Sequence, residues 1–317
     1  MVTSSSDPSA PLILVNPRAS RLADPARRDS IVEAVSRAVQ RRHGRPPRVE
    51  SGTLEATRAA LAEATDAPLV VVIGGDGTVR EAAEALVGRA ATMAVIPGGT
   101  GNVLAGALGI RGVKPGIEAI RSGLPRVLDL GHARWWPARG VTIGADTVHE
   151  RIFTVACGMG LDARIMAAAE HEWKRRIRFG AYIGAAFREL LRLESAEFRI
   201  VADGEIIETE GYLALVVNAG ELIPGRIGPR QPIDPTDGRL DLIVLGGGHP
   251  LSGLRGAAEL MVRSGDLSGR VIRRSVGEVR IESEPIQPIE TDGDPHPARR
   301  LEARVVPGAL TVLVPGR

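Results

Sequence analysis

The chain has 317 residues, a length that usually divides into more than one domain, so we expect two. Its hydrophobic content of 44% is ample for globular packing. The formal net charge is only +2, and we expect no binding to nucleic acid. No apolar run is long enough to span a membrane, and the single cysteine, Cys157, excludes an internal disulfide and suits a reducing cytoplasm. Only Lys114 and Lys174 are lysines, and neither lies in the Gly-Lys-Ser/Thr triplet of a Walker P-loop, which excludes that class of nucleotide-binding protein.

The first half of the sequence alternates short apolar runs with helical patterns. Strands are predicted over residues 12–17, 48–51, 69–73 and 92–96. Helices are predicted from Asp24-Pro25, over residues 54–64 and 79–87, in a short stretch ending at Leu108, and over residues 114–123. This alternation predicts a doubly wound α/β domain with a parallel sheet, which we assign to residues 1–130.

The second half is dominated by short β-rich runs. They cover residues 126–134, 151–157, 196–201, 205–210, 212–218, 240–245, 278–282 and 310–314, with helical stretches at 162–193 and 250–264. The pattern predicts a mainly antiparallel β-sandwich domain over residues 131–299. We allow for the tail from about residue 300 to 317 returning to the first domain.

One glycine-rich segment follows the third predicted strand. After the buried run 69–73 come Gly74, Gly75, Asp76, Gly77 and Thr78. Glycines let backbone N–H groups close around a small anion, and the helix N-terminus that follows favours negative charge. An aspartate in such a place is explained if a divalent cation lies between it and a phosphate. The Thr78 hydroxyl is expected to cap the helix 79–87. The alternative to a phosphate site is a tight strand-to-helix turn in which the glycines only relieve strain.

A second glycine-rich segment, Pro97–Asn102, follows the fourth predicted strand. Ligands of doubly wound sheets bind outside the carboxyl ends of the strands, so both segments can face one crevice. A second such segment is not needed for turning the chain, which favours a nucleotide-phosphate site. The dinucleotide-binding fingerprint fits poorly, because no third glycine follows Gly75-Asp76-Gly77 at the required spacing.

The order of these motifs resembles the diacylglycerol kinase catalytic-domain family, which includes bacterial diacylglycerol kinases and the sphingosine and ceramide kinases. The matching segments extend over nearly the whole chain and are Asn16-Pro17, Gly74–Thr78 with Glu81, Pro97–Asn102, Gly158–Ala163, Asn218 and Asp234–Asp241. The chain departs from the family pattern at Arg80, where asparagine or serine is usual, and at Asp294, where the family has glutamate.

The resemblance implies ATP-dependent phosphorylation of a lipid hydroxyl with Mg²⁺, with ATP in a crevice between the two domains. Asp76 would serve catalysis by holding Mg²⁺ directly or through water. Thr53 or Ser51 corresponds to a family threonine near ATP. The ATP-binding residues implied are Asn16, Thr53, Gly74, Gly75, Asp76, Gly77, Thr78, Glu81, Gly98, Gly99, Thr100 and Asn102.

Two later segments are rich in aspartate. In Asp234–Asp241 the resemblance implies a structural Mg²⁺ held by the Asp237 carboxylate and by main-chain carbonyls near Asp234 and Arg239. The alternative is a set of turn-forming aspartates. In Asp292-Gly293-Asp294 the resemblance implies a general base for the lipid hydroxyl, although a hairpin turn has the same signature. We favour Asp294 as the base, with Asp292 supporting metal or water.

We therefore predict an ATP- and Mg²⁺-dependent lipid kinase, with diacylglycerol as the leading substrate and a membrane surface presenting it. The stretch 173–193 carries six basic residues beside an apolar stripe, which suits either a packed helix or contact with anionic headgroups. The sequence leaves a homodimer open. The alternatives are a kinase of a soluble hydroxyl compound such as NAD, and a nucleotide-binding regulator without turnover.

Overall fold

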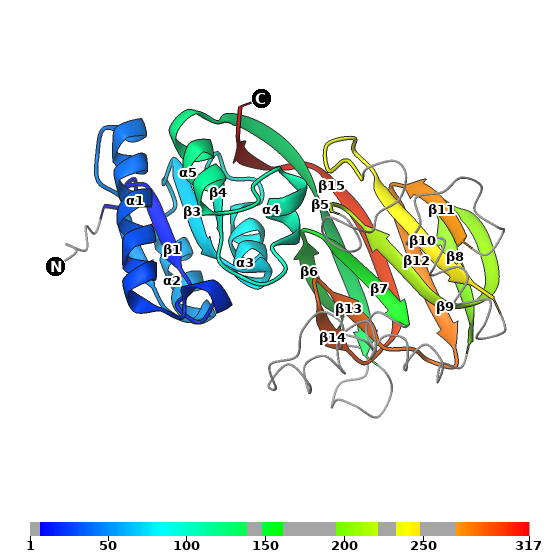
Figure 1. Cartoon of the computed structure of the whole chain (residues 1–317). Coiled ribbons are helices and arrows are strands. Elements are labelled where there is room, and N and C mark those ends of the chain that lie inside the picture. The colour runs from blue at the N-terminus through cyan, green and yellow to red at the C-terminus, as the bar shows by residue number, and fades with distance from the viewer. Residues whose placement is uncertain (1–6, 138–147, 161–194, 221–232, 248–270, 317) are drawn as a thin grey trace. The chain divides into compact units, whose positions relative to one another are not determined.

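The computed structural model describes residues 7–137, 148–160, 195–220, 233–247 and 271–316 (Figure 1). These residues form two compact units: a first unit of residues 1–130 and 307–317, and a second unit of residues 131–306. The chain enters the second unit at Gly131 and returns to the first at Pro307. The predicted helical stretches 162–193 and 250–264 lie outside the described residues. Among the described residues, no helix is long and apolar enough to cross a membrane.

The first unit contains a parallel sheet with the strand order β2-β1-β3-β4-β15. Its strands are β1 (Leu12–Val15), β2 (Arg48–Ser51), β3 (Leu69–Gly74), β4 (Thr92–Pro97) and the end of β15 (Ala298–Val314). The helices are α1 (Pro25–His43), α2 (Leu54–Glu63), α3 (Asp76–Leu86), α4 (Val103–Ala107) and α5 (Val113–Ser122), with a short 3₁₀ helix, η1 (Ser20–Leu22). The predicted doubly wound α/β fold is confirmed.

Apolar spacing explains how these elements pack. Every residue of β3 is buried, as expected for a central parallel strand covered on both faces. Helix α1 buries Ile31, Val35 and Val39, which recur every four residues on one face, and it packs against α5. Helix α2 packs against α3. The sheet is therefore covered by helices, and the loops that follow its strands begin at the carboxyl ends of those strands.

The second unit is antiparallel, with the strand order β14-β13-β7-β9-β8-β12-β15. Strand β10 pairs with β9 and β11, and β5 pairs with β15 and β6. The strands are β5 (Leu124–Pro137), β6 (His149–Phe153), β7 (Ala156–Gly160), β8 (Ala196–Ala202), β9 (Glu205–Val217), β10 (Leu240–Gly246), β11 (Val271–Val276), β12 (Glu278–Glu284), β13 (Ile289–Thr291) and β14 (Asp294–His296). The predicted antiparallel β-sandwich fold is confirmed.

Three strand predictions need correction. The run 151–157 is two strands, β6 and β7, because residues 154 and 155 leave the ladder to bind a carboxylate described below. The runs 205–210 and 212–218 are one strand, β9, which passes through Gly211. A Cβ atom there would lie 2.6 Å from the Leu245 carbonyl oxygen, so the glycine permits close strand pairing instead of ending the strand. The last strand begins at Ala298, well before the predicted Leu310.

Candidate active site

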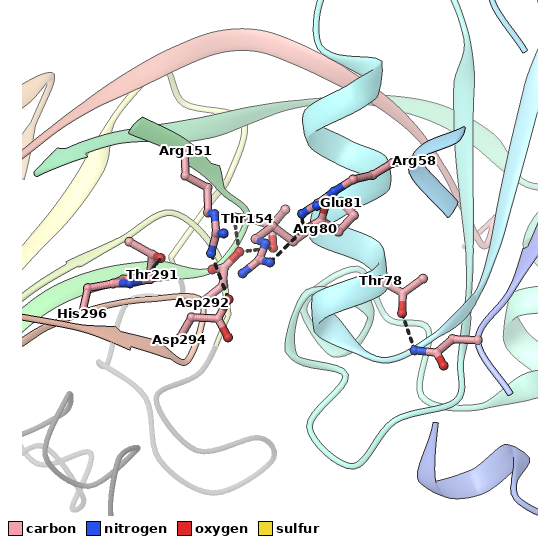
Figure 2. Close-up of polar contacts among 11 residues, drawn as sticks. Arg58, Thr78, Arg80, Glu81, Arg151, Thr154, Thr291, Asp292, Asp294 and His296 are labelled. Atoms are coloured by element: carbon pink, nitrogen blue, oxygen red, sulfur yellow. Dashed lines mark hydrogen bonds and ion pairs between the residues drawn. The ribbon is translucent and has the colours of Figure 1, made fainter. Parts of the chain in front are cut away.

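The first glycine-rich segment forms the N-terminal turn of α3. The helix begins at Asp76 with Gly75 as its N-cap residue, and no side chain caps it. The prediction that Thr78 caps a helix beginning at Val79 is therefore wrong, because Thr78 already lies in the first turn. Its hydroxyl instead accepts a hydrogen bond from Asn16 Nδ2 at 2.9 Å (Figure 2). A helix N-terminus favours negative charge, so this position is compatible with the predicted phosphate site.

The second glycine-rich segment, Pro97–Asn102, is closed by its own last residue. Asn102 has a left-handed backbone with φ of 51°, and its side chain folds back onto Gly99. Its Oδ1 accepts from the Gly99 N–H at 2.9 Å, and its Nδ2 donates to the Gly99 carbonyl at 2.7 Å. The Thr100 hydroxyl lies 3.0 Å from the Ser20 hydroxyl. The loop is thus held in shape by hydrogen bonds of its own residues and of Ser20.

The Asp76 carboxylate joins the two segments. Its oxygens accept the N–H of Asn102 at 2.6 Å and that of Val103 at 2.7 Å, at the beginning of α4. Burial raises the pKa of Asp76, while these N–H groups oppose the shift by stabilising the charged form. The sequence predicted a cation partner for this side chain and did not predict its structural role between the loops.

Close packing explains three of the glycines. A Cβ atom on Gly99 would lie 2.6 Å from the Gly75 Cα, so neither residue tolerates a side chain without moving the other segment. A Cβ atom on Gly101 would lie 2.7 Å from Asp76 Oδ2. These glycines let the two loops touch, a packing requirement that is compatible with a phosphate site and is distinct from turning the chain.

The Glu81 side chain accepts hydrogen bonds from two arginines. Its buried carboxylate accepts from Arg58 Nε at 2.6 Å and Nη2 at 2.9 Å, and from Arg80 Nη2 at 2.9 Å (Figure 2). Burial acts to raise the pKa of Glu81, but the hydrogen bonds from Arg58 and Arg80 outweigh it and the pKa is lowered. Arg80, which departs from the family pattern, therefore forms a buried ion pair with Glu81 on α3.

Replacing Glu81 with Gln is expected to lower the free energy of unfolding at pH 7 by about 3 kcal/mol, because the change removes a buried negative charge that Arg58 and Arg80 both bind. A lowered folded-state pKa means that this contribution is present above the unfolded-state value of 4.5 and is lost as the pH falls through the folded-state value. Urea unfolding at pH 7 and pH 3.5 measures both effects, and the difference between the two proteins should shrink at the lower pH. Glu33→Gln, which breaks an exposed i,i+4 pair with Arg37, is the control and should cost about 0.5 kcal/mol or less.

In the second unit, the Asp292 carboxylate binds the turn between β6 and β7 through hydrogen bonds. Its Oδ2 accepts from the Thr154 N–H at 2.8 Å and from the Thr154 hydroxyl at 3.1 Å. Its Oδ1 accepts from the N–H groups of Val155 at 2.9 Å and Ala156 at 3.1 Å. Burial raises the pKa of Asp292, and the four donors oppose the shift. Four donors match the acceptor capacity of one carboxylate, so this side chain serves as a structural clamp.

Asp294 lies at the start of β14 in a different environment. Its side chain is 52% exposed, and its Oδ2 accepts from Arg151 Nη1 at 2.9 Å (Figure 2). Nearby on the hairpin, the buried Glu290 accepts the Gly293 N–H at 2.7 Å. Of the two aspartates proposed as base, Asp294 is the one whose carboxylate is open to solvent.

The segment directly before β10 contains the three residues predicted for a structural metal. The Asp234 carboxylate accepts from the Thr236 hydroxyl at 2.7 Å, and the Asp237 carboxylate accepts from the Arg239 N–H at 2.9 Å. The Arg239 guanidinium donates to Asp203 at 2.7 Å. The part of the chain that the structure describes holds no group of three acidic, His or Cys residues close enough to bind a metal.

Comparison with known proteins identifies the family. The model of the diacylglycerol kinase catalytic domain matches residues 11–133, and that of the YegS C-terminal NAD kinase β-sandwich-like domain matches residues 155–314. The chain belongs to the diacylglycerol kinase catalytic-domain family. The two matches cover both glycine-rich segments and both aspartate segments, so the resemblance seen in the sequence is confirmed.

Several relatives and a solved structure resemble much of the chain. Protein sll0036 of Synechocystis, described as uncharacterized, is 26% identical over 78% of this chain, which spans about half (54%) of that relative. A probable lipid kinase, YegS-like, of Pseudomonas aeruginosa is 28% identical over 78% of this chain and 76% of its own length. The crystal structure of a putative diacylglycerol kinase from Bacillus anthracis aligns over 96% of this chain and 97% of its own, with a TM-score of 0.72 and 22% identity. This last likeness shows the fold.

The family residues in this chain occupy several distinct places. Asn16, Thr78, Asp76 and Asn102 meet at the carboxyl ends of β1, β3 and β4. Thr53 caps α2 by accepting from the Ala56 N–H at 3.4 Å. Sequence reasoning missed Arg58, Thr154 and Arg151, which bind Glu81, Asp292 and Asp294. Their partners are 23, 138 and 143 residues away along the chain, so no local pattern marked them.

Proposed function

We propose that this lipid kinase transfers the γ-phosphoryl group of ATP to the hydroxyl of diacylglycerol. The observation that carries the proposal is the joining of two glycine-rich loops by Asp76 at the N-terminus of α3. The description of the family model supports diacylglycerol as the substrate class. A membrane that presents the lipid follows from that substrate. The stretch 173–193, for which a packed helix and headgroup contact are both open, lies outside the described residues.

In this proposal the first unit binds the phosphates of ATP. Phosphoryl transfer requires chiefly positioning and neutralisation of charge on the transferred group. Backbone N–H groups at the start of α3 and the hydroxyls of Thr78 and Thr100 are the donors for the phosphate oxygens. Asn16 orients Thr78 by donating to its hydroxyl, and Asn102 keeps the second loop closed. The donors are held by contacts within the protein, so little ordering remains to be done on binding.

The residues around Asp76 fit Mg²⁺. The Asp76 carboxylate accepts the N–H groups of Asn102 and Val103, and a carboxylate is the kind of hard oxygen ligand that Mg²⁺ takes in proteins. Mg²⁺ usually retains several waters and takes few protein carboxylates, so one carboxylate suffices with the phosphates of the nucleotide. Bound there, the ion would supply charge neutralisation on the phosphates.

The second unit supplies the base in this proposal. Asp294 takes the proton from the lipid hydroxyl while that oxygen forms its bond to the γ-phosphorus and the bond from the γ-phosphorus to the bridging oxygen of ADP breaks. Such a base must come within about 3 Å of the proton it removes, which an exposed carboxylate permits. Asp292 keeps the adjoining turn in place.

Radiolabelled ATP tests the proposal directly. The purified chain is incubated with Mg²⁺ and, in separate reactions, diacylglycerol in mixed micelles, a sphingoid base, ceramide and NAD. We expect label in phosphatidic acid. Transfer to NAD alone would establish the soluble-substrate alternative; NAD is included because the description of the C-terminal family model likens that domain to the β-sandwich of NAD kinases. Nucleotide binding without transfer to any acceptor would indicate a regulator.

We also propose a structural Mg²⁺ at the turn of Asp234, Asp237 and Arg239. One exposed carboxylate with turn carbonyls suits this cation, although Asp237 also stabilises the turn by accepting from the Arg239 N–H. Replacing Asp237 with Asn is expected to lower activity about 10-fold at 1 mM Mg²⁺, with partial recovery at about 20 mM, because the neutral amide is a weaker ligand. Activity measured against Mg²⁺ concentration checks this, and equal curves for both proteins would exclude the site.

A further inference from the structure

The proposed base has a fixed partner of opposite charge. Arg151, in β6, donates from Nη1 to Asp294 Oδ2 at 2.9 Å, although the two residues are 143 positions apart (Figure 2). The Arg151 side chain is 23% exposed and that of Asp294 is 52% exposed. An ion pair with this exposure contributes little to stability. Its presence at the base therefore calls for another explanation.

The pairing of β5 with β6 gives Arg151 its direction. Arg151 lies opposite Ala133, and His149 lies opposite Trp135. Residues directly opposite in an antiparallel pair lie on the same face, and alternate residues of one strand share a face. His149, Trp135 and Arg151 therefore lie on one face of this two-stranded ladder.

The same face meets β14. Asp294 and His296 are two residues apart in β14 and share its face. The His296 ring stacks on Trp135 with the ring centroids 4.7 Å apart, and Trp135 stacks on His149 at 5.6 Å. Strand β14 is thus fixed against the ladder at His296, which leaves Asp294 beside Arg151 with little freedom to move.

A guanidinium has a rigid planar fork, so its hydrogen bond constrains the direction of a carboxylate as well as its position. The side chain of Asp294 is one methylene shorter than the glutamate of the family pattern, which makes its placement more demanding. We propose that Arg151 is a positioning residue that holds Oδ2 of Asp294 so that Oδ1 receives the proton of the acceptor hydroxyl. This inference rests on the proposed function.

The test uses the full chain with Mg²⁺, ATP and diacylglycerol in mixed micelles. Arg151→Gln is expected to lower kcat about 10- to 100-fold, the effect of a small misplacement of a reacting group, with KM for both substrates changed less than about 2-fold. Arg151→Lys should retain an intermediate kcat and serves where the Gln variant fails to fold. Arg199→Gln, which breaks an exposed cross-strand pair with Glu208 in the same unit, is the matched control and should leave kcat unchanged.

A double-mutant cycle separates positioning from direct contact with the phosphoryl group. If Arg151 acts through Asp294, then Arg151→Gln should change the residual kcat of Asp294→Asn less than about 2-fold. Additive losses would overturn the inference, as would full kcat in Arg151→Gln while the unaltered chain phosphorylates lipid. Absence of transfer by the unaltered chain to every lipid offered would overturn the proposed function and this inference with it.

Discussion

Replacing Asp294 with Asn is expected to lower kcat for lipid phosphorylation about 100-fold or more, the usual contribution of a general base. The amide has nearly the same shape but cannot accept a proton from the lipid hydroxyl. Stability should change little, because the side chain is 52% exposed and an ion pair at such a position contributes little. Single-turnover phosphorylation with saturating ATP, together with urea unfolding, measures both quantities.

The Asp292→Asn variant is compared with Asp294→Asn because it is expected to change stability. Its amide group would turn N–H donors toward the backbone N–H groups that the carboxylate now accepts, so the free energy of unfolding should fall by about 2 kcal/mol. Asp66→Asn, at an exposed aspartate bonded to Thr65, is the control for both and should change neither quantity. Loss of turnover at full stability in Asp292→Asn, with turnover kept in Asp294→Asn, would reverse the assignment of the base.

The nucleotide half of the candidate site could be predicted because its residues are close in sequence. A buried strand, a glycine-rich turn and a helix occur in one run, and parallel strands bring the ends of β3 and β4 to the same edge. The helix start was misplaced by three residues because Thr78 resembles an N-cap, whereas Gly75 takes that position. A hydroxyl at the first turn is ambiguous from sequence, since its partner, Asn16, comes from another strand.

For the residues proposed to act on the lipid hydroxyl, the sequence predicted the Asp292-Gly293-Asp294 motif but not the separate roles of its two aspartates. Asp292 and Asp294 are two residues apart, yet one is a buried clamp with four donors and the other an exposed partner of Arg151. That difference depends on β6 and β7, which precede the hairpin by some 140 residues and whose interruption at residues 154 and 155 is caused by the clamp itself. Local sequence carries no information about such long-range hydrogen bonds, so the two roles became distinguishable only in the folded chain.

Replacing Asp76 with Asn is expected to weaken Mg²⁺–ATP binding and to lower kcat about 100-fold, because a loop shift of about 1 Å has an effect of that size on phosphoryl transfer. The amide oxygen can accept only one of the two N–H groups, of Asn102 or Val103, and its NH₂ group would face the other. The free energy of unfolding should fall by about 1 to 3 kcal/mol, the cost of an unsatisfied buried donor. Calorimetric titration with a non-hydrolysable ATP analogue and urea unfolding measure the two effects.

Asp24→Asn is the matched control for this change. Asp24 caps α1 in the same unit by accepting a single N–H, that of Ala26 at 3.0 Å, and asparagine caps helices about as well as aspartate. The Asp24 variant should therefore keep its stability and its affinity for the nucleotide, whereas the Asp76 variant should lose both. Full nucleotide affinity and kcat in Asp76→Asn would contradict a role for this carboxylate in the phosphate site. Lost affinity at unchanged stability would show that Asp76 acts on the cation and does not hold the two loops together.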